Sequence, residues 1–72
     1  MTLGQMADAV ATAMNAVHAT HLTGKDVFDC DPQGELWPIW ALYDAYVEHT
    51  GEWGDSGKRY AVRLLALEAR RP

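Results

Sequence analysis

The sequence predicts an all-α domain: a small three-helix bundle in which the aromatic-rich second helix is central. Three separate segments show the 3.6-residue period of apolar side chains that is typical of amphipathic helices, and each has its own start or stop signal. Hydrophobic residues make up 49% of the chain, a share that is typical of folded proteins and excludes disordered ones. Because 72 residues suffice for one domain only, we expect residues 1–72 to form a single helical domain.

The central helix is predicted over Leu36–Thr50, which holds two of the three Trp and two of the three Tyr. Pro38 suits a first helical turn, where no N–H partner is needed, and Gly51 suits the position after the last turn. The apolar face predicted for this helix comprises Leu36, Ile39, Trp40, Tyr43, Tyr46 and Val47. Because Trp40 belongs to this face, Trp40→Ala is expected to cost about 3–5 kcal/mol of stability. Trp37 lies off the face and is expected to fold over the helix start or to meet a partner.

The first helix is predicted to begin at a capping box, with Thr2 as the N-cap and Gln5 as the N3 residue. Its narrow, largely apolar stripe comprises Leu3, Met6, Val10, Met14, Val17 and His21. We expect Gly24 to end this helix. The turn residues at 31–34 predict a loop between the first and second helices, from which Val27 and Phe28 pack into the core.

The third helix is predicted over about residues 58–69, with Asp55 or Ser56 as its cap. Its apolar side comprises Tyr60, Ala61, Leu64, Leu65 and Leu67. Arg70 and Arg71 follow at the C-terminal end, where basic side chains favour the negative pole of the helix dipole.

Charge is distributed unevenly along the chain, whose net charge is −4. Residues 1–57 carry nine acidic residues against Lys25 alone, whereas residues 58–72 carry five basic residues against Glu68. Such a field can steer a basic partner to the acidic side, although a merely solvated surface would show the same pattern. We therefore predict a non-enzymatic interaction protein that binds and inhibits or modulates a larger protein with a basic surface. The predicted partner-binding residues are Asp29, Asp31, Glu35, Trp37, Asp44, Glu48, Glu52 and Trp53.

The class of partner follows from the charge, because an acidic helical surface can imitate the charge of nucleic acid. A nucleic-acid-handling enzyme is thus one plausible target, as for inhibitors of the phage or mobile-element type, although no motif identifies a family. The alternative is a small DNA-binding regulator, because Arg59, Arg63 and Arg70 share one side of the third helix. Nucleic acid is the less favoured partner, because the acidic second helix would then face the phosphates. A third alternative is an oligomeric structural subunit.

Other chemistry is weakly indicated. His18 and His21 are three residues apart and could share a metal with Cys30 or His49, but the chain lacks a paired Cys motif. Residues 29–34 resemble the first half of a calcium loop, yet Trp40 stands where the bidentate Glu belongs. Residues 51–58 are one residue too long for a phosphate loop. Because a three-helix domain rarely shelters a catalytic pocket, we expect no enzymatic activity, cofactor or metal.

Association and location complete the sequence prediction. The wide apolar faces of the second and third helices exceed what the narrow stripe of the first can cover, so we expect at least a homodimer, held by apolar contacts and oriented by charge. No apolar run reaches the roughly 18–20 residues that span a bilayer. Residues 1–20 lack the basic region of a secretory signal, and the single Cys allows no internal disulfide. We expect a soluble, cytoplasmic protein.

Overall fold

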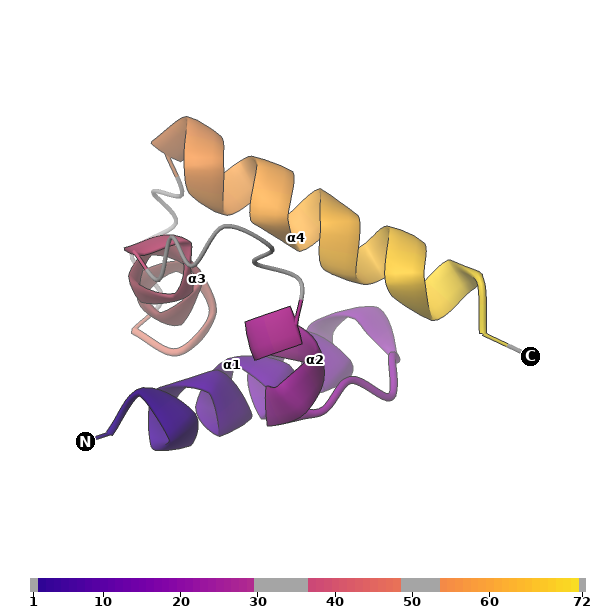
Figure 1. Ribbon diagram of the computed structural model, residues 1–72, viewed down its shortest axis with the longest axis horizontal. Helices are drawn as coiled ribbons and strands as arrows, with labels where there is room; N and C mark the ends of the chain where they lie inside the picture. Colours follow the sequence, from indigo (N-terminus) through magenta and orange to yellow (C-terminus); the bar gives the residue numbers. More distant parts are fainter. Residues whose placement is uncertain (1, 30–36, 49–53, 72) are drawn as a thin grey trace.

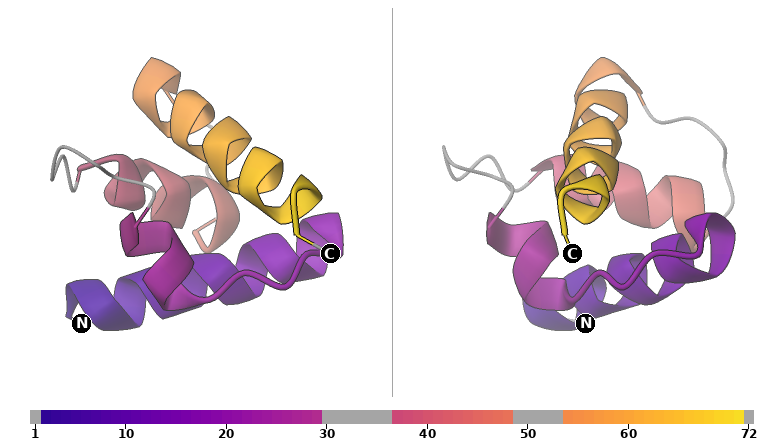
Figure 2. Two further views of the ribbon diagram at one scale, coloured as in Figure 1. Left: turned by 45° about the vertical axis from the view of Figure 1, so that its right-hand side comes forward. Right: turned by 90° about the vertical axis from the view of Figure 1, so that its right-hand side faces the viewer.

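The structure is a computed structural model that describes residues 2–29, 37–48 and 54–71 (Figure 1). Over these residues it contains no strand, and its helices are α1 (Leu3–His18), α2 (Gly24–Asp29), α3 (Trp37–Tyr46) and α4 (Gly54–Ala69). The all-α class is confirmed. Three helices are predicted, and the structure has a fourth: the short helix α2 lies where the sequence predicts a loop. Both α2 and α3 pack against α1, and α4 packs against α3, so α3 has a helix on either side (Figure 2).

Helix α1 begins as predicted and ends earlier than predicted. The Thr2 hydroxyl accepts from the Gln5 backbone N–H at 3.1 Å, and the Gln5 side chain accepts from the Thr2 N–H at 2.9 Å, which confirms the capping box. The helix stops at His18, because Ala19 adopts a left-handed conformation with φ 56° and ψ 40°. Gly24 is therefore wrong as the predicted stop. His21 consequently leaves the apolar stripe and is exposed.

The Asn15 side chain explains where the chain turns. Its Oδ1 accepts from the Leu22 N–H at 2.8 Å and from the Thr20 hydroxyl at 2.7 Å, while its Nδ2 donates to the Leu22 carbonyl at 2.9 Å. These bonds hold the segment after α1 against the last turns of the helix. Leu22, which the sequence analysis did not place in the core, is buried as a result.

Helix α2 begins at a second capping box, between Thr23 and Asp26. The Thr23 hydroxyl accepts from the Asp26 N–H at 3.2 Å, and the Asp26 carboxylate accepts from the Thr23 N–H at 2.8 Å. Gly24 is buried at the first position of this helix, where α2 approaches α1 closely. Val27 is fully buried and Phe28 packs against the core, as predicted.

The core consists of one cluster drawn from all four helices and the segment before α2. Its buried members are Met6, Ala7, Val10, Ala11, Met14, Leu22, Val27, Ile39, Leu42, Tyr46, Tyr60, Ala61 and Leu64. Helix α4 starts at Gly54 and not near residue 58, so Asp55 and Ser56, predicted to precede it, lie inside its first turn. Tyr60, Ala61 and Leu64 are buried on α4 as predicted, whereas the predicted Leu65 and Leu67 are only half-buried.

Trp40 is the main error in the predicted core. Its side chain is 54% exposed, whereas Ile39, Leu42 and Tyr46 are 0%, 0% and 5% exposed. Helix α3 is therefore rotated relative to the predicted face, and its buried stripe is narrower and mainly aliphatic. The buried stripes of α3 and α4 are covered within one chain, because these helices pack against each other and α1 covers more of α3. Tyr43, Leu65 and Leu67 of the predicted apolar faces are half-buried, and the homodimer stays a prediction.

Replacing Gly24 and replacing Gly4 by alanine are expected to change stability in opposite directions. Gly24→Ala is expected to destabilise by on the order of 1 kcal/mol, because the added Cβ would overlap the Asp8 carboxylate and lie 3.2 Å from the Asp8 backbone N. Gly4→Ala is expected to stabilise by about 0.5 kcal/mol, since its Cβ would meet only the Thr2 Oγ1, at 3.8 Å. Urea unfolding measures both. Wild-type stability of Gly24→Ala would contradict the close approach of α2 to α1.

The rotation of α3 is tested by comparing two of its residues. Leu42→Ala is expected to cost about 2–5 kcal/mol, because it removes a fully buried side chain and leaves a cavity. Trp40→Ala is expected to cost less than about 1 kcal/mol, because the indole is half exposed. Thermal unfolding followed by circular dichroism gives both values. A larger loss for Trp40→Ala than for Leu42→Ala would restore the orientation that the sequence predicts.

Candidate interaction surface

The exposed side of α3 carries an aromatic side chain followed by two acidic ones. Trp40 is 54% exposed, and Asp44 and Glu48 are exposed at intervals of four residues, Glu48 lying just past the helix end. This spacing places the three side chains along one face. Among the described residues, neither carboxylate has an ion-pair partner. We call Trp40, Asp44 and Glu48 the α3 stripe; Asp44 and Glu48 belong to the predicted partner-binding set, and Trp40 does not.

Of the other predicted partner-binding residues, the structure describes the side chain of Asp29 alone. Asp29 is exposed at the end of α2, where its carboxylate accepts a hydrogen bond from Lys25 Nζ at 2.6 Å. This bond and the charge of Asp29 raise the pKa of Lys25. The remaining residues of the predicted set lie outside the part of the chain that the structure describes: Asp31, Glu35, Glu52, Trp53 and the side chain of Trp37.

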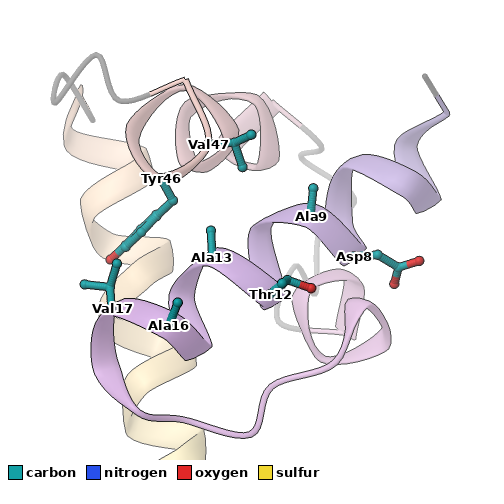
Figure 3. Close-up of a pocket in the computed structure, with 8 residues that line it drawn as sticks. All are labelled: Asp8, Ala9, Thr12, Ala13, Ala16, Val17, Tyr46 and Val47. Atoms are coloured by element: carbon teal, nitrogen blue, oxygen red, sulfur yellow. The ribbon is translucent and has the colours of Figure 1, made fainter.

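A shallow, mainly apolar groove of about 530 Å³ lies between α1 and the C-terminal end of α3 (Figure 3). Its lining residues are Asp8, Ala9, Thr12, Ala13, Ala16, Val17, Tyr46 and Val47. Asp8 and Val17 stand at opposite ends of the α1 side, and Val17 is 63% exposed. The sequence analysis missed this α1–α3 groove, although alanines spaced three or four residues apart on a helix indicate a surface that another element can approach closely.

Tyr46 and His18 join α1 to α3 beside the groove. The Tyr46 hydroxyl lies 2.8 Å from His18 Nε2, and the two rings meet edge-on with centroids 5.6 Å apart. Burial raises the pKa of the Tyr46 hydroxyl above its ordinary value of 10.0, so it keeps its proton and can donate it to His18. This contact explains why a tyrosine occupies the end of the buried α3 stripe.

His18 and His21 do not share one helical face, because α1 ends at His18. His21 instead contacts Glu68 through both its backbone N–H and its ring Nδ1, each 3.1 Å from Glu68 Oε1. The argument for a shared metal from helical spacing is therefore wrong. Within residues 2–29, 37–48 and 54–71, no three His, Cys, Asp or Glu side chains are grouped to hold a metal ion. Cys30 and His49 are not among the described residues.

Arg71, just after the end of α4, contacts both α2 and the segment that precedes α2. It pairs with the Asp26 carboxylate, donates to the His21 carbonyl at 3.3 Å, and lies 3.6 Å from Glu68 Oε2. Partial burial acts to raise the pKa of Asp26, but hydrogen bonds from Arg71 and Thr23 outweigh it and lower this pKa below its ordinary value of 3.8. Asp26 is thus committed to a contact within the chain and does not belong to an acidic docking surface.

Basic side chains gather on the outer side of α4. Arg59, Arg63 and Arg70, the residues of the alternative nucleic-acid face, are all exposed, and so are Lys58 and Val62. Val62 is 58% exposed in the middle of this group. In the described part of the chain, no helix has the length and apolar character needed to cross a bilayer.

The Asp26–Arg71 pair predicts a pH dependence of stability. Because folding lowers the pKa of Asp26, its contribution is present above the unfolded-state pKa and is lost as pH falls through the lower folded-state pKa. Arg71→Gln is therefore expected to lower stability by about 1 kcal/mol or less at pH 7, and this difference should shrink towards about pH 2. Thermal unfolding at several pH values measures it. In an Asp26→Asn background, Arg71→Gln should cause a smaller loss of stability. An equal loss in that background would mean that Arg71 stabilises the fold through Glu68 and not through Asp26.

Comparisons of the chain with protein-family models, with curated proteins and with solved structures found no match. The candidate surfaces are therefore defined by the packing of this chain alone: the α3 stripe, the α1–α3 groove and the basic side of α4.

Proposed function

We propose that this chain is a small non-enzymatic interaction protein that binds a basic surface of a larger protein and so inhibits or modulates it. The observation that carries the proposal is the α3 stripe, in which Trp40, Asp44 and Glu48 share one exposed face. An indole that is half exposed on a helix offers a large apolar anchor to a partner. The two exposed carboxylates beside it attract basic side chains and so speed the encounter with a basic partner.

The exposure of Trp40 is better explained by a binding partner than by a surface that only contacts water. A buried indole would contribute more to the stability of the chain than an exposed one, yet the fold buries Ile39 and Leu42 and leaves Trp40 outside. Asp44 lies near the end of α3 and Glu48 just past it, four positions further along the chain. Because such a row of negative charge resembles the backbone of a nucleic acid, the class of partner we propose is a nucleic-acid-handling enzyme, as for inhibitors of the phage or mobile-element type.

A second candidate is direct nucleic-acid binding by α4, and one observation favours it: Arg59, Arg63 and Arg70 are all exposed. The same packing opposes it, because α3 lies directly against α4 and carries two exposed carboxylates. These would approach the phosphates of a duplex that docked along α4. Electrophoretic mobility of a short generic duplex at low salt separates the two candidates, since only the second predicts a shift that Arg63→Gln weakens.

The proposed docking is tested by affinity capture with matched variants. Tagged wild-type chain, Trp40→Ala, Asp44→Arg and Asp29→Arg are exposed to a lysate of the source cells, and the retained proteins are compared by quantitative mass spectrometry. A true partner should be retained by the wild type and by Asp29→Arg, and depleted roughly tenfold or more by each α3 variant.

The Asp29→Arg variant is the control, because it makes the same change in charge at an exposed acidic residue outside the α3 stripe. Circular dichroism verifies that all the variants remain helical. The proposal fails if every protein retained by the wild type is retained equally by Trp40→Ala and Asp44→Arg. Retention that is lost with Asp29→Arg as well would indicate attraction to total charge and not docking on α3.

A further inference from the structure

Two further surfaces of the chain complement each other, and the first of them borders the α3 stripe. The first is the α1–α3 groove, whose apolar floor is bordered by Asp8 at one end. Asp44 of the α3 stripe does not line the groove, but it precedes the lining residue Val47 by three positions and so lies beside the rim. The second is the outer side of α4, where the exposed Val62 is flanked by Lys58 and Arg63. One surface is an acidic, concave apolar site, and the other is a basic, convex one.

We propose that the α1–α3 groove of one copy receives the outer side of α4 from a second copy. Val62 of the docking helix would enter the groove between the alanines of α1 and Val47. The aliphatic stems of Lys58 and Arg63 would extend along the groove, with their charged ends reaching Asp8 and Asp44. Alanine at positions 9, 13 and 16 of α1 leaves room for a second helix to approach closely.

Charge complementarity is the reason to assign the groove to a second copy of this chain. Asp8 and Asp44 have no ion-pair partner among the described residues, in contrast to Asp26 and Asp29. Lys58 and Arg63 are likewise exposed, and neither forms an ion pair within residues 2–29, 37–48 and 54–71. The chain therefore carries both halves of one contact on different surfaces. A contact between two different surfaces is heterologous, so it continues from copy to copy unless its rotation closes a ring.

The contact is weak and sensitive to salt. On the docking side of α4 the exposed apolar side chain is Val62, and the groove that would receive it is shallow. Such a contact buries far less apolar surface than an obligate dimer interface does. Most of the attraction then comes from exposed charges, which salt screens. This differs from the dimer held by apolar contacts that the sequence predicts, because the most buried residues of those helix faces, including Leu42 and Leu64, pack within one chain.

Sedimentation velocity over a range of concentrations, from about 10 μM to about 1 mM, tests the self-association. At about 0.05 M salt the mean mass should rise from 8.0 kDa beyond that of a dimer as concentration increases, and it should return towards 8.0 kDa at about 0.5 M salt. Val62→Glu and Ala13→Arg, which alter the two sides of the contact separately, should each weaken association by roughly tenfold or more. A wild-type chain that stays at 8.0 kDa throughout would overturn the proposal.

A charge exchange identifies the contact itself. Asp44→Lys and Arg63→Glu should each prevent association alone, because each sets like charges against one another, whereas a mixture of the two variants should associate again. Asp29→Lys, with the same change in net charge as Asp44→Lys, should associate like the wild type. Failure of the mixture to recover, with both variants helical by circular dichroism, would overturn the proposed pairing. Arg63→Glu leaves the α3 stripe intact, so loss of self-association with retained partner capture separates this inference from the proposed function.

Discussion

The hydrogen bonds of the Asn15 side chain determine how the rest of the chain is arranged. They hold the backbone of Leu22 and the hydroxyl of Thr20 against α1, and the helix ends at His18 in consequence. Only with this turn can α2 run beside α1 and bury Gly24 and Val27. The turn also places His21 and Asp26 where α4 ends, so that Glu68 and Arg71 contact them. The partly buried Asn15 amide thus holds the turn that brings α2 and the segment before it next to the end of α4.

Which aromatic side chains are buried depends on whether their polar atoms find a hydrogen-bond partner within the chain. Tyr46 and Tyr60 are buried, and each hydroxyl has a partner: His18 Nε2 for Tyr46 and the Val27 carbonyl for Tyr60. Such partners allow a tyrosine to be buried without leaving a polar group unsatisfied. Trp40 is left on the surface, where its indole N–H can meet water. This exposure is the basis of the interaction surface that we propose on α3.

Packing also changes which acidic residues remain available. The sequence contains an acidic block from residue 26 to residue 55, and the prediction treats its members alike. In the structure Asp26 binds Arg71 and Asp29 binds Lys25, whereas Asp44 and Glu48 are exposed without such partners in the described chain. Asp8, which is distant in sequence, lines the groove next to α3. Within the described residues, the acidic side chains without an ion-pair partner therefore come from α1 and from α3 with the residues just after it.

The sequence alone determined the all-α class, the Thr2–Gln5 cap and the buried side of α4 around Leu64, because a helical period and a cap depend on neighbours within one or two turns. It located two of the α3 stripe residues by charge. The tertiary structure alone decided the end of α1, the existence of α2, the rotation of α3 and the groove. Helix α3 is apolar around much of its circumference, so its period does not distinguish Trp40 from Leu42 as the buried residue. That choice depends on the surfaces of α1 and α4, which are far away in sequence.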